Sequence, residues 1–198
     1  VMEDVSLHAT PAFKREGDMV VIIGEPYGLV SSLAGSEYLE IVHGKVAGLP
    51  SSPDLSGEKR YADLVRKLIR DGIVDTAHDI SGGGHSVALA EMALAGGIGM
   101  DYEGEVNFED LRRSGEDLDL FLFGEGGSSF LIAFPEDRWD EVQDALAGFA
   151  YDWLGHTGGD RLRVGDLIDL GLGDLKRTYE RDLFGIPGEV VGGTEAVG

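Results

Sequence analysis

Glycine occupies 31 of the 198 positions, which limits this chain to short elements joined by tight turns or close backbone approaches. The glycines follow no fixed period, so a collagen-like helix is excluded. There are no cysteines, which excludes a disulfide scaffold, a thiol nucleophile and a cysteine zinc site. At this length one core buries close to ~70% of the unfolded chain's surface. We therefore expect a single domain over residues 1–184 and a loose tail over residues 185–198.

Short β-branched runs alternate with apolar stripes at spacings of three and four residues, which predict strands and helices respectively. Strands are expected at 18–24, 73–80, 98–102, 128–134, 153–156, 162–164 and 167–170, and helices at 36–44, 56–70, 85–95, 136–146 and 175–183. Pro135 is expected at the first position of the helix at 136–146. The apolar run 118–123 is ambiguous, and 108–116 is expected to be a polar helix or turn. Several strands adjoin by turns, which favours an α+β (α/β layered) fold with a mixed, mainly antiparallel sheet and helices packed on it.

The charge is strongly acidic, with 37 Asp and Glu against 16 Lys and Arg, a net charge of −21. A field of this sign repels phosphate backbones and anionic lipid, so neither nucleic acid nor a membrane surface is an expected partner. The acid excess is explained either by solubility or by adaptation to a saline cytoplasm. No apolar run approaches the ~20 residues of a membrane span, and no signal peptide is expected from the N-terminal residues. The expected compartment is the cytoplasm.

The densest group of chemically capable residues lies where an expected strand enters three glycines and then a helix. Successive glycine N–H groups at a helix N-terminus form a cradle for a phosphate or another anion. The spacing matches neither a dinucleotide fingerprint nor a Walker A loop. A purely structural alternative stays open, in which the glycines only let the helix pack close to the strand. The candidate ligand-facing residues are His78, Asp79, Ser81, Gly82, Gly83, Gly84 and His85.

A second candidate loop combines a capped helix start with a glycine-rich turn. Ser36 and Glu37 begin the helix expected at 36–44, and Glu125 lies among glycines before the strand at 128–134. The alternatives are a simple helix cap and a tight turn. The acidic residues between 105 and 119 do not have the spacing of an EF-hand loop, so no metal site is predicted there.

Thr76 to Gly84, followed by Val87 to Ala93, resembles the H-D-V-S-D-G-G-L-x-V-A-L-A-E-M-A signature of the phosphoribosylformylglycinamidine synthase large subunits. That family belongs to the superfamily of aminoimidazole ribonucleotide synthase. Further segments resemble the family at Ile22–Glu25, Ala34–Tyr38, Leu122–Glu125 and Ser129–Phe130. The resemblance covers about residues 3 to 183, which is nearly the whole chain.

The resemblance implies the C-terminal domain of the second half of an internally doubled subunit, with the fold of the C-terminal domain of aminoimidazole ribonucleotide synthase. The intact enzyme uses ATP, Mg²⁺ and glutamine-derived ammonia to convert formylglycinamide ribonucleotide to formylglycinamidine ribonucleotide in purine biosynthesis. Its catalytic and Mg²⁺-binding residues lie in N-terminal ATP-handling domains. The present chain is therefore expected to be a non-catalytic half-module that holds no metal or cofactor by itself. The implied partners are those N-terminal domains, a glutamine amidotransferase and a small bridging subunit.

The chain departs from the family signature in both candidate loops. Gly82 replaces an Asp, His85 replaces a Leu, and residues 125–129 replace Glu-Ser-Gln-Ser-Arg. The losses of an Asp, a Gln and an Arg remove polar groups that could orient a ligand, which favours a scaffolding role. The alternative is a stand-alone nucleotide-binding or regulatory protein of the same superfamily. If the chain acts as a module, the isolated chain exposes an interdomain face, and we expect it to self-associate.

Overall fold

The computed structural model describes residues 4–24, 32–50, 52, 54–104 and 118–183. The helix or turn expected at 108–116 and the tail expected at 185–198 lie outside the described residues. No helix in these described ranges is long and apolar enough to cross a membrane.

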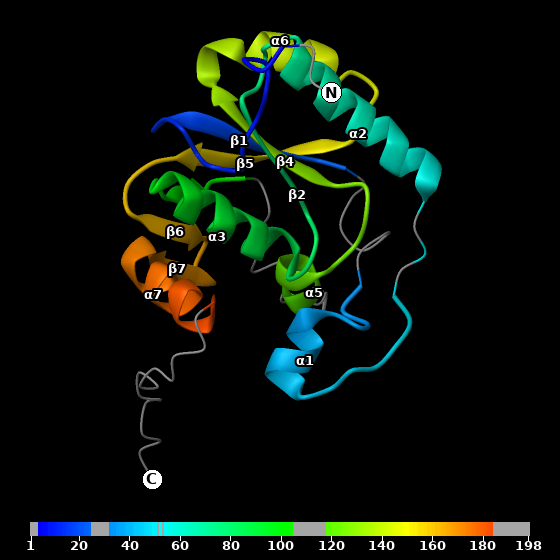
Figure 1. The fold of residues 1–198 in the computed structure, drawn as a ribbon, viewed down its shortest axis with the longest axis vertical. Coiled ribbons are helices and arrows are strands. Elements are labelled where there is room, and N and C mark those ends of the chain that lie inside the picture. Colours follow the sequence, from blue (N-terminus) through cyan, green and yellow to red (C-terminus); the bar gives the residue numbers. More distant parts are fainter. Residues whose placement is uncertain (1–3, 25–31, 51, 53, 105–117, 184–198) are drawn as a thin grey trace.

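One seven-stranded sheet forms the centre of the fold, in the order β2-β4-β1-β5-β3-β6-β7 (Figure 1). Its strands are β1 Asp18–Ile23, β2 Thr76–Asp79, β3 Met100–Tyr102, β4 Phe130–Pro135, β5 Tyr151–Thr157, β6 Arg161–Val164 and β7 Ile168–Gly171. Neighbouring strands run antiparallel except β3 and β6, which are parallel. The prediction of an α+β fold with a mixed, mainly antiparallel sheet is confirmed.

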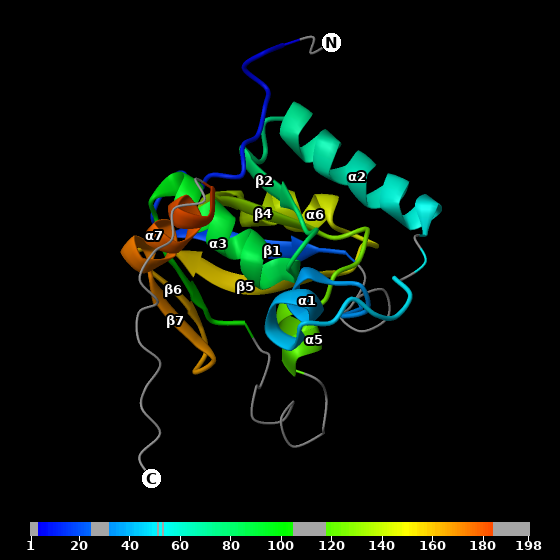
Figure 2. The same cartoon turned by 60° about the horizontal axis from the view of Figure 1, so that its bottom comes forward.

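Helices cover both faces of this sheet (Figures 1 and 2). They are α1 Glu37–His43, α2 Leu55–Arg70, α3 Gly84–Gly96, α5 Leu118–Phe123, α6 Trp139–Ala145 and α7 Leu172–Leu183, with a short 3-10 helix η1 Glu136–Arg138. The helices α3 and α5 pack on one face, with α7 against it, and α2 and α6 pack on the other. Because both faces are covered, the strands in the middle of the sheet carry apolar side chains on both sides.

Strand β1 shows this double burial directly. Val20 and Ile22 point into the core beneath α3, whereas Val21 and Ile23 point into the core beneath α2. This alternation follows from the two-residue repeat of a strand. The unbroken apolar run that predicted a buried strand at 18–24 therefore contributes side chains to both hydrophobic cores.

Several predicted boundaries were wrong, although the elements themselves are present. The strand expected at 73–80 is limited to Thr76–Asp79, and the helix expected at 175–183 begins at Leu172. Pro135 is not the first helical residue: it ends β4 with an extended ψ of 140° and precedes η1. It keeps that extended shape because it still pairs with Asp18 across the sheet. The ambiguous run 118–123 is the helix α5, packed against α3.

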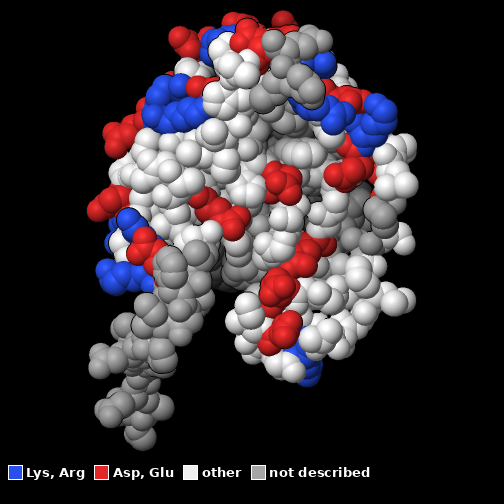
Figure 3. All heavy atoms as spheres, viewed as in Figure 1, with Lys and Arg blue, Asp and Glu red and all other residues white. Residues whose placement is uncertain are grey.

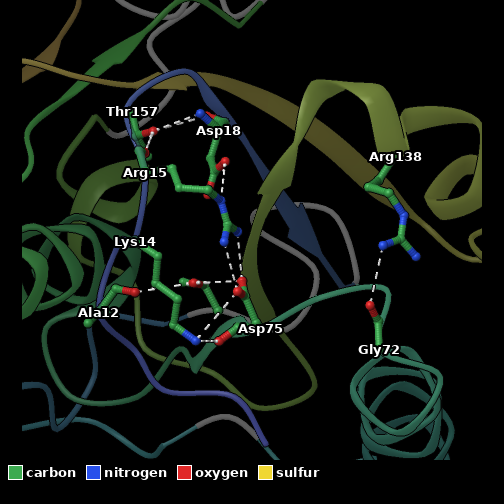
Figure 4. Close-up of polar contacts among 9 residues, drawn as sticks. Ala12, Lys14, Arg15, Asp18, Gly72, Asp75, Arg138 and Thr157 are labelled. Carbon is green, nitrogen blue, oxygen red and sulfur yellow. Dashed lines mark hydrogen bonds and ion pairs between the residues drawn. The ribbon is translucent and has the colours of Figure 1, made fainter. Parts of the chain in front are cut away.

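A polar network joins the start of β1 to the segment that leads into β2 (Figure 4). Arg15 donates to both carboxylate oxygens of Asp75, at 2.8 and 2.9 Å, and its Nε donates to Asp18 at 3.0 Å. Asp18 is 2% exposed, and burial raises the pKa of its carboxyl despite the Arg15 hydrogen bond. The Arg15 hydrogen bonds lower the pKa of Asp75. Arg15 is thus the cation that compensates a buried carboxylate.

The Arg15→Ala variant is expected to lose about 1–3 kcal/mol of unfolding free energy, because it leaves the Asp18 carboxylate buried without its cation. This loss of unfolding free energy is smaller than the loss expected for a fully buried ion pair, because the Arg15 side chain is 41% exposed. Urea denaturation at neutral pH measures the change. The control Arg66→Ala, which breaks an exposed pair with Asp63, is expected to cost less than about 0.5 kcal/mol. Equal losses in the two variants would contradict the assigned role of Arg15.

Candidate functional site

The three-glycine loop follows β2 and begins α3, as the sequence predicts. Gly83 is the residue before the helix and has a left-handed backbone, with φ 80°, and Gly84 has φ 70°. A Cβ at Gly84 would lie 2.7 Å from the carbonyl carbon of Phe123 and 2.9 Å from the carbonyl oxygen of Gly124. The glycines therefore permit both the turn and the close approach of the end of α5.

The carboxylate of Glu125 joins the two predicted loops. Its Oε1 accepts a hydrogen bond from the Gly83 N–H at 2.8 Å and another from the Glu37 N–H at 2.9 Å. These amides begin α3 and α1, so the carboxylate faces two helix N-termini, where negative charge is favoured. The sequence predicted that amides of the glycine loop would bind an anionic ligand. In the structure the Gly83 amide binds the Glu125 carboxylate of the chain itself.

The backbone around Glu125 is also anchored. Glu125 exchanges two hydrogen bonds with Ser32, one from each N–H, at 2.8 and 2.9 Å. Further along the same turn, buried Ser128 has a φ of 69° and donates from Oγ to Glu58 Oε2 at 2.9 Å. Ser32, Glu58 and Ser128 were missed by the sequence reasoning. Contacts that join distant segments leave no local sequence pattern.

Ser36 and Glu37 lie where the sequence expected them, at the start of α1. Ser36 is buried, and its Oγ accepts from the Leu39 N–H at 3.1 Å and donates to the Leu33 carbonyl at 2.6 Å. Ser36 is therefore a helix cap, and Gly44, the last residue of the helix expected at 36–44, ends α1 in the left-handed conformation with φ 63°. Tyr38 stacks on Phe123 with ring centroids 4.9 Å apart, which fixes α1 against the end of α5.

His85 lies in the first turn of α3 but faces the core. It is 3% exposed, and its ring meets Phe121 edge to face with centroids 5.0 Å apart. Burial lowers the pKa of His85 to about 4, and a hydrogen bond with the Phe121 backbone opposes that shift. The imidazole is neutral at neutral pH and packs as a core side chain.

His78 and Asp79 lie at the end of β2, with Ser81 and Gly82 exposed in the loop beyond them. His78 Nδ1 is 2.6 Å from the Asp79 carbonyl oxygen, and Nε2 is 3.1 Å from a carboxylate oxygen of Glu91 on α3. The Asp79 side chain is 69% exposed. His78 therefore joins β2 to α3, and Asp79 points to solvent.

The described residues contain no group of three or more His, Asp or Glu side chains that would hold a metal ion. Around Glu125 the described residues supply backbone amides gathered about one carboxylate, and the hydrogen bonds of His78 to Asp79 and Glu91 hold β2 against α3. Such an arrangement positions segments, and no proton transfer or nucleophilic step is derived from it.

The Glu125→Ala variant is expected to lose about 1–3 kcal/mol of unfolding free energy, because the buried Gly83 N–H loses its acceptor. Water replaces the carboxylate at the exposed Glu37 amide, so most of the loss comes from Gly83. Glu125→Gln keeps an acceptor oxygen and is expected to lose less. Chemical denaturation measures both, with Asp144→Ala, an exposed carboxylate on α6, as the control. A loss no larger than that of the control would show that the Glu125 hydrogen bonds do not stabilise the starts of α1 and α3.

Comparison with known sequences places the chain in a family. The AIR synthase related protein, C-terminal domain, matches residues 15–165. The phosphoribosylformylglycinamidine synthase subunit PurL of Mesorhizobium japonicum is 38% identical over 186 residues, which cover 91% of this chain and 24% of that protein. The same subunit of Methylocella silvestris is 40% identical over 182 residues, covering 91% of this chain and 23% of its own length. The chain spans about a quarter of the curated relatives that it matches.

Solved structures share the fold at lower sequence identity. A structure described as T. maritima PurL complexed with FGAR matches with a TM-score of 0.68 and 16% identity, covering 86% of this chain and 30% of that one. The hydrogenase maturation protein HypE of E. coli matches with a TM-score of 0.51 and 19% identity, covering 83% of this chain and 52% of that one. The match over residues 15–165, most of the described fold, shows that the chain belongs to the family of AIR synthase related proteins, C-terminal domain.

Proposed function

We propose that this chain is the C-terminal domain of the second half of a phosphoribosylformylglycinamidine synthase. That enzyme converts formylglycinamide ribonucleotide to formylglycinamidine ribonucleotide with ATP and glutamine-derived ammonia. The observation that carries the proposal is the 38–40% identity to two PurL subunits over 91% of the chain. The proposed unit is one domain over residues 1–184.

Within that enzyme the chain serves as a non-catalytic structural module. The hydrogen bonds of Glu125 support this role, because an internal carboxylate already meets the amides of Gly83 and Glu37. ATP and Mg²⁺ belong to the N-terminal ATP-handling domains of the same enzyme. The described residues offer no group of carboxylates for the metal, so no step through Mg²⁺ is derived for this domain.

The two candidate loops are proposed to brace the N-terminal ATP-handling domain, and the exposed residues Asp79, Ser81 and Gly82 are those that would meet it. In the complete assembly the partners are a glutamine amidotransferase, which supplies the ammonia, and a small bridging subunit, in the cytoplasm. A solved structure described as PurLQS from Thermotoga maritima has this fold within its chain, with a TM-score of 0.63.

The test is a chimera in which residues 4–183 replace the matching quarter of the M. japonicum subunit. Assembled with the other subunits of that synthase, the chimera is expected to form formylglycinamidine ribonucleotide, measured with ATP and glutamine present. The subunit with that quarter deleted is the negative control. A folded chimera that forms no product would overturn the proposed function. Binding of Mg-ADP by the isolated chain would favour a stand-alone nucleotide-binding protein instead.

A further inference from the structure

The surface of α1 and of the segment that leads into α2 is unusually apolar. Every residue from Ile41 to Pro50 is exposed, and α1 buries none of its own residues. The large apolar side chains of this surface are 56–88% exposed. Together we call them the α1–α2 surface: Ile41, Val42, Val46, Leu49 and Leu55. They make up half of the large hydrophobic side chains that are exposed in the described part of the chain.

This surface also lacks the acidic residues that dominate the rest of the chain. From Ile41 to Pro53 there is no Asp or Glu, and Lys45 is the single charged residue. A stretch of this length ordinarily carries about three charged residues. Figure 3 shows the lobe that carries α1 and the following segment mostly white on its outer side, beside a row of acidic residues. Charge depletion around exposed apolar side chains is typical of the centre of an interface.

The backbone of the segment is fixed in a shape that keeps these side chains outside. The Gly35 N–H donates to the Ala47 carbonyl at 2.9 Å, and the Lys45 N–H donates to the Leu39 carbonyl at 3.2 Å. Gly48 lies so close to Ala34 that a Cβ would come within 2.5 Å of the Ala34 side chain. The apolar residues are therefore displayed on an ordered support.

We propose that the α1–α2 surface docks onto the domains of the synthase that lie outside this chain. The proposal rests on the proposed function, and the chain's relatives supply the partner: about three quarters of their length has no counterpart here. A second copy is the weaker occupant, because two chains of charge −21 repel each other. The expected self-association of the isolated chain would use this surface and would increase with salt.

Direct contacts connect the α1–α2 surface to the glycine loop that begins α3. The Glu37 amide at the start of α1 shares the Glu125 carboxylate with Gly83, and Tyr38 stacks on Phe123. A partner seated on α1 therefore holds the loop that begins α3 in register with the rest of the enzyme.

The absence of cysteine from the chain allows a direct test by thiol labelling. Val46→Cys and Leu49→Cys probe the α1–α2 surface, and Leu170→Cys and Tyr179→Cys are matched controls at exposed apolar positions elsewhere. Maleimide labelling of each site is followed by peptide mass spectrometry in the free chain and in the chimeric synthase. We expect labelling at 46 and 49 to slow by about tenfold or more in the chimera, because an interface core excludes water, and labelling at the controls to stay within about twofold.

Each outcome separates this proposal from the proposed function. An active chimera in which positions 46 and 49 stay as reactive as in the free chain would overturn the docking surface and leave the function standing. Equal slowing at all four sites would also overturn it, because the protection would not be local. Slowing in the free chain as its concentration rises, together with unchanged labelling at 46 and 49 in the chimera, would assign the surface to a second copy. A folded chimera without activity would overturn the proposed function itself.

Discussion

Gly84→Ala is expected to lower the free energy of unfolding by about 2–5 kcal/mol. The residue has a φ of 70°, and an L side chain in that left-handed region costs about 1–2 kcal/mol. The added Cβ would also lie 2.7 Å from the backbone of Phe123, which no side-chain rotation relieves. Displacing that backbone adds a cost of about 1–3 kcal/mol. Urea denaturation followed by far-UV circular dichroism measures the loss.

Gly82→Ala is the matched control two residues earlier. Gly82 does not have a positive φ, and a Cβ there would meet only the Glu37 Cγ, at 3.8 Å. Alanine reduces the conformational freedom of the unfolded chain, so this variant is expected to be neutral or more stable by up to about 1 kcal/mol. If Gly84→Ala were as stable as Gly82→Ala, the close packing of the loop against the end of α5 would be wrong.

The chain is expected to lose about 2 kcal/mol of stability between pH 7 and pH 5 because of His85 alone. Burial lowers the pKa of His85 from 6.5 to about 4, so the unfolded state gains a proton in this range while the folded state does not. The stabilising contribution of the neutral ring is complete above the unfolded pKa and is lost as the pH drops, and the loss reaches about 3 kcal/mol at pH 4. Urea denaturation across this range measures the slope.

His85→Phe keeps an aromatic ring against Phe121 and is expected to remove this component of the pH dependence. His43→Gln removes an exposed imidazole at the end of α1 and is the control, which keeps the slope because His85 is untouched. NMR titration of the His85 ring gives an independent readout. A His85 pKa near 6.5 in the folded chain would show that the ring is accessible to water.

Local patterns in the sequence were sufficient where one segment determines its own structure. The stripe from Tyr61 to Leu68 predicted α2, and these residues are its buried face. The helix expected at 36–44 has the ends of α1, which Ser36 and Gly44 cap, because a cap depends on a few neighbouring residues. Boundaries failed where strand pairing decides them: Pro135 remains extended because it pairs with Asp18, more than a hundred positions away in the chain.

The sequence by itself determined the fold class, the family resemblance and the glycine loop before α3, because each of these depends on residue types at short spacing. Only the tertiary structure decided what that loop contacts. It brought Glu125 from the far end of α5 to the amides of Gly83 and Glu37 and turned His85 into the core. The reason is physical: hydrogen bonds between distant segments, and the burial of an amphipathic side chain such as histidine, depend on how helices pack on the sheet, which no local pattern encodes.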